Sequence, residues 1–252
     1  MSNLLKLGTG NAKLGKTTII MDLPAGHSCP FAKDCNEKVN RKTGKLIVNP
    51  DAKFRCFAAV SELISKAARE KRWYNFELLQ ACANEQEMAQ LIIDSINSQK
   101  ATKDAPLVRI HSSGDFYNET YFKAWLLVAK AFPEKTLYAY TKSLKYWVNN
   151  LDVIPENFHI TASRGGHSDD LIDLHNLKNV VIVFSTEEAQ EKNLIIDHDD
   201  SCVYNKDIHS FALLIHGMQA AGSDAMQAVM TLRKKGTTGY NRGSKGKGRK
   251  TA

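Results

Sequence analysis

The chain has 252 residues, 43% of them hydrophobic, and a formal net charge of +7. This composition excludes a wholly disordered chain, and no apolar stretch approaches the length of a membrane span. Eight basic residues between Arg233 and Lys250, with no acid among them, leave the remainder at −1, so the charge does not mark the whole protein as a nucleic-acid binder.

A phosphate-loop pattern, G-x4-G-K-[ST], occurs at residues 10–17 (GNAKLGKT). Such a loop binds phosphate when a strand enters it and a helix follows it. The residues after Lys16 are β-branched and end at Pro24, so they predict a strand over 17–21. A P-loop-type nucleotide-binding protein is therefore kept only as an outside alternative.

Cys29, Cys35 and Cys56 lie in a turn-rich loop over 24–56 with the spacing C-x5-C-x20-C. The proline and charged residues around Cys29 and Cys35 argue against burial of these two cysteines in a packed core. The start of the chain shows no secretion signal, which disfavours disulfides and predicts a cytoplasmic protein. Three thiolates on a [4Fe-4S] cluster leave one iron open to a small molecule. The triad predicts a metal-binding loop that holds an iron-sulfur cluster, and zinc is the main alternative occupant.

The other two cysteines have more ordinary interpretations. Cys82 follows an apolar run and is predicted to lie in a helix core. Cys202 lies in a polar stretch and is predicted to be a surface thiol, although a role as a fourth ligand stays open.

Strand-like and helix-like segments alternate along the chain. Strands are predicted at 17–21, 107–111, 137–141, 158–162, 180–184 and 211–216, and helices at 57–70, 75–98, 119–131, 144–151 and 222–234. Such alternation implies parallel strands with right-handed crossovers. We expect one α/β domain over 1–235, a partly open or closed (β/α)6-type barrel, with a doubly wound sheet as the alternative. The glycine-rich basic tail over 236–252 is predicted to be disordered and suited to contact nucleic acid.

Polar residues follow five of the predicted strands. In α/β barrels the reactive groups collect at the carboxyl ends of the strands, and these residues are typical of that edge. Each one alone is also a common helix cap or turn residue, but as a set they indicate a ligand site. The residues expected to contact a substrate are His111, Tyr140, Arg164 and His216.

Five segments resemble those of the bacteriophage gene product 88 family: residues 10–16 (GNAKLGK), 23–26 (LPAG), 54–59 (FRCFAA), 72–76 (RWYNF) and 211–217 (FALLIHG). The likeness covers nearly the whole chain. It implies a phage-encoded protein of the host cytoplasm, and the family name carries no activity.

A more distant resemblance is to radical S-adenosylmethionine enzymes, particularly the spore photoproduct lyase-like branch. It is carried by the cysteine triad, by Ser113, Gly114 and Asp115 after the second strand, and by Thr141, Lys142 and Ser143 after the third. The resemblance implies that the cysteines hold a [4Fe-4S] cluster and that the two tripeptides bind S-adenosylmethionine. Asp115 would then accept from the cofactor's ammonium group, and Lys142 or Arg164 would pair with its carboxylate.

The chain departs from that superfamily in two places. The usual cysteine spacing there is C-x3-C-x2-C, and the acidic motif is Gly-Gly-Glu rather than Ser-Gly-Asp. Two other classes therefore stay open. In one, zinc held by the three cysteines and His27 stabilises a non-enzymatic ligand- or nucleic-acid-binding protein. In the other, the triad binds nothing, and the polar edge acts as a ligand sponge or interaction surface. The substrate, a small molecule or a nucleotide, and the oligomeric state are not specified.

Overall fold

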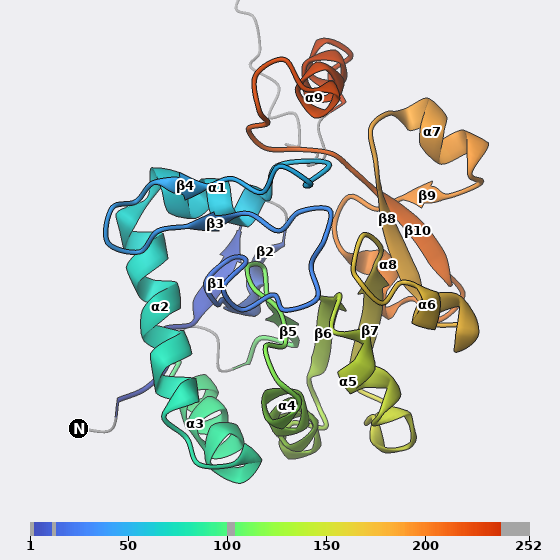
Figure 1. The fold of residues 1–252 in the computed structure, drawn as a ribbon. Coiled ribbons are helices and arrows are strands. Elements are labelled where there is room, and N and C mark those ends of the chain that lie inside the picture. The colour runs from blue at the N-terminus through green and yellow to red at the C-terminus, as the bar shows by residue number, and fades with distance from the viewer. Residues whose placement is uncertain (1–2, 12–13, 100–103, 238–252) are drawn as a thin grey trace, which may run out of the picture.

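The computed structural model describes residues 3–11, 14–99 and 104–237, which form a mixed α/β fold around a mainly parallel sheet (Figure 1). The sheet has eight strands in the order β1-β2-β5-β6-β7-β8-β10-β9. They are β1 Gly8–Asn11, β2 Gly15–Met21, β5 Leu107–Ile110, β6 Thr136–Thr141, β7 Phe158–Ser163, β8 Asn179–Val183, β9 Ile195–Ile196 and β10 Ser210–Leu214. A separate hairpin pairs β3 Lys38–Val39 with β4 Leu46–Ile47.

Six parallel strands, β2, β5, β6, β7, β8 and β10, follow one another across the sheet in chain order. All six predicted strands are confirmed within about two residues. A doubly wound sheet reverses its strand order at a switch point, and this one does not. Within the described ranges the outermost strands β1 and β9 do not pair with each other, so the ladder is open and no closed barrel is formed by hydrogen bonds.

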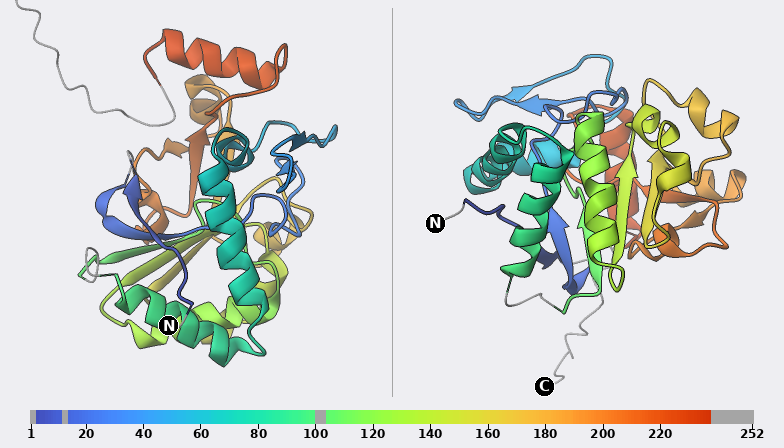
Figure 2. Two further views of the ribbon diagram at one scale, coloured as in Figure 1. Left: turned by 90° about the vertical axis from the view of Figure 1, so that its left-hand side faces the viewer. Right: turned by 90° about the horizontal axis from the view of Figure 1, so that it is seen from below.

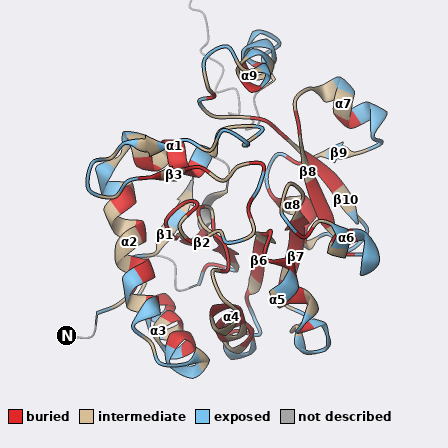
Figure 3. Cartoon of the chain, viewed as in Figure 1, coloured by how far each residue is buried: buried red, intermediate tan, exposed pale blue. Residues whose placement is uncertain are grey.

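One face of the sheet is covered by helices. Buried side chains of α2 Lys66–Gln80, α3 Glu85–Asn97, α4 Glu119–Ala131, α5 Leu144–Val148 and α6 Asp170–Leu174 share one apolar core with β2, β5, β6 and β7. Figure 2 shows α3 and α4 side by side along this face, and Figure 3 shows that their sheet-facing sides are buried. A smaller core joins α7 Thr186–Glu191 and α9 Asp224–Lys234 to β8 and β10.

The short helix α8, Ser201–Tyr204, packs on part of the opposite face of the sheet. Cys202 and Val203 of α8 pack against Tyr138, Val180 and Phe211, which come from β6, β8 and β10. Side chains alternate between the two faces of a strand, so the partners of α8 and of the outer helices come from alternate positions. The segment that follows β9 thus fills the inner side of the curved sheet below the carboxyl ends of its strands.

The helix boundaries differ from the predicted ones in several places. The segment 57–98 forms α1 Phe57–Ile64, α2 and α3, with breaks at Ser65 and at 81–84, because the side chains of Ser65 and Asn84 cap the helices that follow them. The predicted helix 119–131 is confirmed as α4, whereas 144–151 is α5 followed by a 3-10 turn at Leu151–Val153.

The phosphate-loop pattern lies in an antiparallel hairpin. Gly8 pairs with Ile20, and the residues after the loop form β2 rather than a helix, as predicted. No helix there can cap a phosphate group, because the described residues from Gly15 to Met21 are all strand. The basic tail over 236–252 lies outside the described residues except for Gly236 and Thr237. None of the helices in the described part of the chain is long and apolar enough to cross a membrane.

Candidate functional site

A pocket of about 170 Å³ opens at the carboxyl ends of β5, β6, β7, β8 and β10. A single water needs only about 10–15 Å³, so this space is large enough to hold a small ligand. The loop over 24–56 and the start of α1 form its outer wall. The predicted site residues that line it are Cys29, Cys35, Cys56, His111, Ser113, Gly114, Asp115, Tyr140, Thr141, Lys142 and His216.

The three cysteines meet in this pocket. The Cys56 thiol donates a hydrogen bond to Cys35, which together with nearby Lys142 lowers the pKa of the Cys35 thiol to about 6. Burial raises the pKa of Cys29, and its closeness to Asp115 and Cys35 adds to the effect. The hydrogen bond to Cys35 and burial raise the pKa of Cys56. One thiolate, shared with a neighbouring thiol, is therefore expected at neutral pH.

The loop that carries Cys29 and Cys35 is fastened to the turn after β7. The Lys33 and Asp34 amides both donate to the Gly165 carbonyl, at 3.2 and 3.0 Å, and His167 N donates to the Phe31 carbonyl at 2.9 Å. Gly165 has φ +96°, and a Cβ there would lie 2.8 Å from Asp34 Oδ2. The close approach of the two segments, which fixes Cys35 beside Lys142, thus requires glycine at this position.

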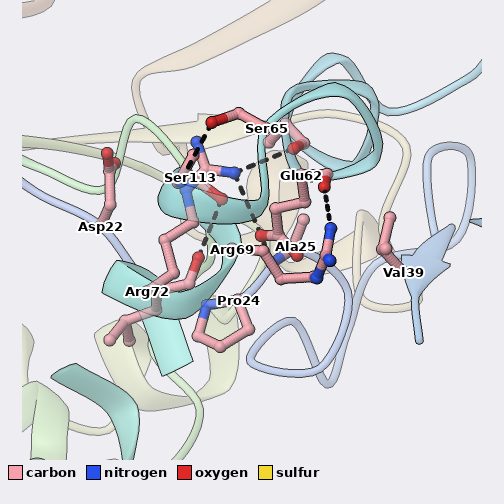
Figure 4. A network of polar contacts seen from close by, with 12 residues as sticks. Asp22, Pro24, Ala25, Val39, Glu62, Ser65, Arg69, Arg72 and Ser113 are labelled. Carbon is pink, nitrogen blue, oxygen red and sulfur yellow. Dashed lines mark hydrogen bonds and ion pairs between the residues drawn. The ribbon is translucent and has the colours of Figure 1, made fainter. Parts of the chain in front are cut away.

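A buried polar network holds the two ends of the loop (Figure 4). Glu62 of α1 accepts from the Ala25 amide at 2.8 Å and from Arg72 Nη1 of α2 at 3.0 Å. Arg72 Nη1 also donates to the Ala58 carbonyl, and Arg69 Nη1 donates to the Glu62 carbonyl. Because Cys56 is the N-cap residue of α1, the network that positions this helix also positions Cys56.

Asp115 joins the ends of β5 and β6. Its carboxylate accepts from the Phe116 amide, the Thr141 hydroxyl and the Lys142 amide, at 2.7, 2.5 and 2.8 Å. Burial raises the Asp115 pKa, and these three hydrogen bonds oppose the shift. A carboxylate has about four acceptor positions, so one remains for a ligand. Asp115 thus connects the loops after β5 and β6, and its carboxylate can still accept a hydrogen bond from a bound cation.

Lys142 points to the end of β7. Its Nζ donates to the Ser163 carbonyl at 3.0 Å, to the Ser163 hydroxyl at 2.6 Å and to the Arg164 carbonyl at 3.2 Å. An ammonium group has three donors, and all are used here. The lysine therefore supplies positive charge beside Cys35, while all three of its hydrogen-bond donors are satisfied by protein acceptors.

His111 follows β5 with φ +70°, a conformation that few residues other than glycine adopt. Its Nε2 lies 3.0 Å from the Tyr121 hydroxyl, and its Nδ1 is buried without a hydrogen-bond partner. Burial, and secondly Arg109, lowers the His111 pKa to about 3, so the ring is neutral at physiological pH. At the other wall, His216 packs on Phe57 with ring centroids 4.9 Å apart.

The floor of the pocket is an ion pair that we did not predict. Arg109 Nη1 of β5 donates to Asp200 Oδ2 at 2.8 Å, and the Tyr138 and Tyr140 hydroxyls donate to the same carboxylate at 3.2 and 3.1 Å. An arginine at an inward position of an otherwise apolar strand is the sequence signal that could have found it. Its partner Asp200 could not be identified, because the chain positions are 91 residues apart.

Several predicted residues lie elsewhere. Arg164 turns away from the pocket to Asn179 and Asp173. Ser143 is the N-cap residue of α5 but makes no side-chain capping bond, and its hydroxyl donates to the Phe116 carbonyl instead. Cys202 is buried in α8, so the prediction of a surface thiol was wrong: the polar residues before it turn inward to the floor. Cys82 was predicted to lie in a helix core, but it lies in the segment between α2 and α3, partly buried against the main core.

A single-ion metal site is not formed by these thiols as they stand. Within the described ranges, no group of three or more His, Cys, Asp or Glu side chains is arranged to hold one metal ion. His27, the fourth ligand expected for zinc, has its Nε2 3.1 Å from the Val39 carbonyl and its ring against Trp73. The three cysteine thiols line one pocket, but they are not arranged with His27 around one tetrahedral centre.

Comparison with known proteins gives a family. A family model described as "Gene product 88" matches residues 3–238. The "Gene 88 protein" of Mycobacterium phage D29 is 30% identical over 138 residues, 53% of this chain and 50% of the relative. The protein of the same name from Mycobacterium phage L5 is 29% identical over 138 residues, 53% of this chain and 51% of the relative. The match thus spans about half the length of these curated relatives, and no solved structure matches the chain.

Proposed function

This chain belongs to the gene product 88 family, whose relatives come from bacteriophages, and we propose that it is a radical S-adenosylmethionine-like iron-sulfur enzyme acting on a small molecule or nucleotide. The observation that carries the proposal is the convergence of Cys29, Cys35 and Cys56 with Asp115 in one pocket at the carboxyl ends of a parallel sheet wound in chain order. In this proposal the curved sheet is a partly open (β/α)6-type barrel.

We favour an iron-sulfur cluster over a single ion because a cluster places looser demands on the spacing of its ligands. Zinc draws its ligands to within about 2.0–2.3 Å of one centre, and the described thiols do not form such a centre. A [4Fe-4S] cluster binds each thiolate at a different iron, so its ligands need only surround a common space. The three thiols border such a space in the pocket. Cluster binding would replace the hydrogen bond between Cys35 and Cys56.

When bound and reduced by an external donor, the cluster would supply the one electron that cleaves the 5′ carbon–sulfur bond of S-adenosylmethionine into methionine and a 5′-deoxyadenosyl radical. The chain's own residues would bind S-adenosylmethionine and orient it. The remaining acceptor position of Asp115 suits an ammonium group, and Ser113, Gly114 and Thr141 border the same space. Apolar side chains of β8 and β10 wall the pocket and exclude water, which protects reactive species. Lys142 contributes charge rather than a free hydrogen-bond donor.

Anaerobic reconstitution with iron and sulfide tests the proposal. We expect about four iron and four sulfide per chain and, with S-adenosylmethionine and dithionite, release of 5′-deoxyadenosine. Cys35→Ala should lose most of the iron, and Cys82→Ala is the matched control, since Cys82 lies outside the pocket. One zinc per chain without iron would refute the proposal in favour of a zinc-stabilised binding protein. Equal iron loss in both variants would show that the pocket is not the cluster site.

A further inference from the structure

The loop over 24–56 carries an excess of positive charge. It has seven Lys and Arg residues against three Asp and Glu residues, whereas the other described residues have 19 against 24. Three of its basic residues are ion-paired, namely Arg41, Lys53 and Arg55. The remaining four make no ion pair with any residue that the structure describes, and we call them the loop cations: Lys33, Lys38, Lys42 and Lys45.

The loop cations are spread over the carboxyl ends of the sheet. At one end, the Lys33 amide donates to the Gly165 carbonyl after β7. At the other end, the Arg41 carbonyl, next to Lys42, accepts from Arg69 of α2, a helix that packs beside β2. Figure 1 shows the β3–β4 hairpin at this end, beside α1 and the start of α2. The strands β2 and β7 are three strand spacings apart, about 14 Å. One phosphate group cannot contact both ends of this span, whereas a chain of phosphates can.

The pocket opens beneath this span. Cys29, Cys35 and Phe54 of the loop line it between the two ends. Phe57, directly after the loop, also lines the pocket, keeps 40% of its surface exposed and packs on His216. Aromatic rings beside basic side chains are typical of proteins that stack the bases of a single strand. A base must leave its stack to enter a pocket, which costs least when the strand is not in a duplex.

An anionic membrane surface is the rival partner. Ile47 and Val48 are exposed apolar residues that follow Lys45 in the hairpin. A membrane-binding surface gathers its cations around the apolar residues that it inserts. Here the charge continues to the far end of the loop, at Lys33 and at the exposed Lys145 of α5, which lies over an aromatic ring of the same loop. Positive charge on both sides of a pocket with an exposed aromatic ring favours a nucleic-acid strand.

We propose that the loop cations bind the phosphate backbone of a single-stranded nucleic acid and that Phe57 stacks on a base at the pocket. This inference names the substrate class of the proposed function and rests on the pocket being its substrate site, but it does not rest on the cluster. The contact to the strand is then made by the cysteine-bearing loop and does not depend on the basic tail.

Fluorescence anisotropy with the full chain, with and without reconstituted iron and sulfide, tests this inference. The probes are labelled single strands of DNA and of RNA of about 12 nucleotides and the matching DNA duplex. Vesicles of phosphatidylserine are tested by co-sedimentation. A single strand should bind more tightly than the duplex. Lys33→Gln/Lys42→Gln, which changes both ends of the span, should weaken strand binding about tenfold to thirtyfold at ~0.1 M salt. It should also reduce the slope of log K against log salt by about 1.4, or about 0.7 for each lost phosphate contact.

Lys130→Gln/Lys206→Gln is the matched control. Both lysines are exposed and make no ion pair within the described ranges, but they precede β6 and β10 and so lie toward the amino ends of the strands. This variant should change strand binding less than twofold and leave the salt slope unaltered. Phe57→Leu separates stacking from charge, because it should weaken strand binding at least about fivefold without changing the salt slope.

Four results would overturn the inference: no binding of either single strand, tighter binding of the duplex, equal effects of the two double variants, or binding of vesicles alone. Strand binding by a chain that takes up no iron would uphold the inference and refute the proposed enzyme. Iron uptake and release of 5′-deoxyadenosine without strand binding would do the reverse.

Discussion

Substituting His111 by asparagine should remove a large part of the acid sensitivity of this protein. The His111 ring lies beside Arg109 of its own strand, Tyr121 of α4 and Phe116 of the following loop, and Asp115 is close along the chain. Burial and Arg109 together lower its pKa from 6.5 to about 3. Between these two pH values, His111 is therefore neutral in the folded protein and protonated in the unfolded chain.

The sign and size of this pH effect on the free energy of unfolding follow from proton linkage. Between pH 6.5 and 3 the unfolded chain binds more protons at His111, so the free energy of unfolding falls as the pH falls. Each pH unit in that interval costs about 1.4 kcal/mol. Acidification from pH 7 to pH 5 should therefore cost the wild type about 2 kcal/mol more than His111→Asn. Asparagine suits the variant because it tolerates positive φ better than most residues.

The assay is urea unfolding of both proteins at pH 7 and pH 5, followed by tryptophan fluorescence. The variant loses the contact to Tyr121, so it should be less stable at pH 7, but that loss is common to both pH values. Groups that titrate in both proteins cancel in the difference. Equal losses of stability on acidification would refute the reasoning and show that the ring can be protonated in the folded state.

Two further substitutions test what holds the cysteine loop. Glu62→Gln should reduce the free energy of unfolding by about 3 kcal/mol, because it leaves the buried Arg72 without its counter-charge. The control Glu70→Gln, which removes an exposed ion pair with Arg41, should cost less than about 1 kcal/mol; similar costs would contradict the anchoring role of Glu62. Gly165→Ala should cost about 1–3 kcal/mol more than Gly222→Ala in thermal or urea unfolding, since both glycines have positive φ but only Gly165 would press a Cβ against Asp34. It should also lower iron uptake, and full uptake would show that the contact does not position Cys35.

Much of the fold could be predicted from local patterns. The six parallel strands are short β-branched or aromatic runs bounded by polar residues, and a buried strand needs little more than that. Helix boundaries were harder, because Ser65 and Asn84 are ordinary polar residues until their side chains cap a helix. The two-residue strands β3, β4 and β9 were missed, since such short pairings carry no periodicity.

The candidate site divides along similar lines. The cysteines, Asp115 and Lys142 were recognisable because chemically distinctive residues follow strands whose carboxyl ends share one edge. Arg164 follows the same rule, yet its guanidinium leaves the pocket for Asp173 and Asn179. The rule places a backbone at the edge of the sheet and does not fix the direction of a long, flexible side chain.

The sequence by itself determined the parallel α/β architecture and which residue types stand at the ends of its strands, because both depend on local periodicity and chain order. Only the tertiary structure decided that Asp200 would pair with Arg109 beneath the pocket, that α8 would fill the inner face of the sheet, and that His111 and Thr161 would be left with unused polar atoms. Those outcomes depend on contacts between distant segments, and burial there gives each charge or hydrogen bond its energetic weight.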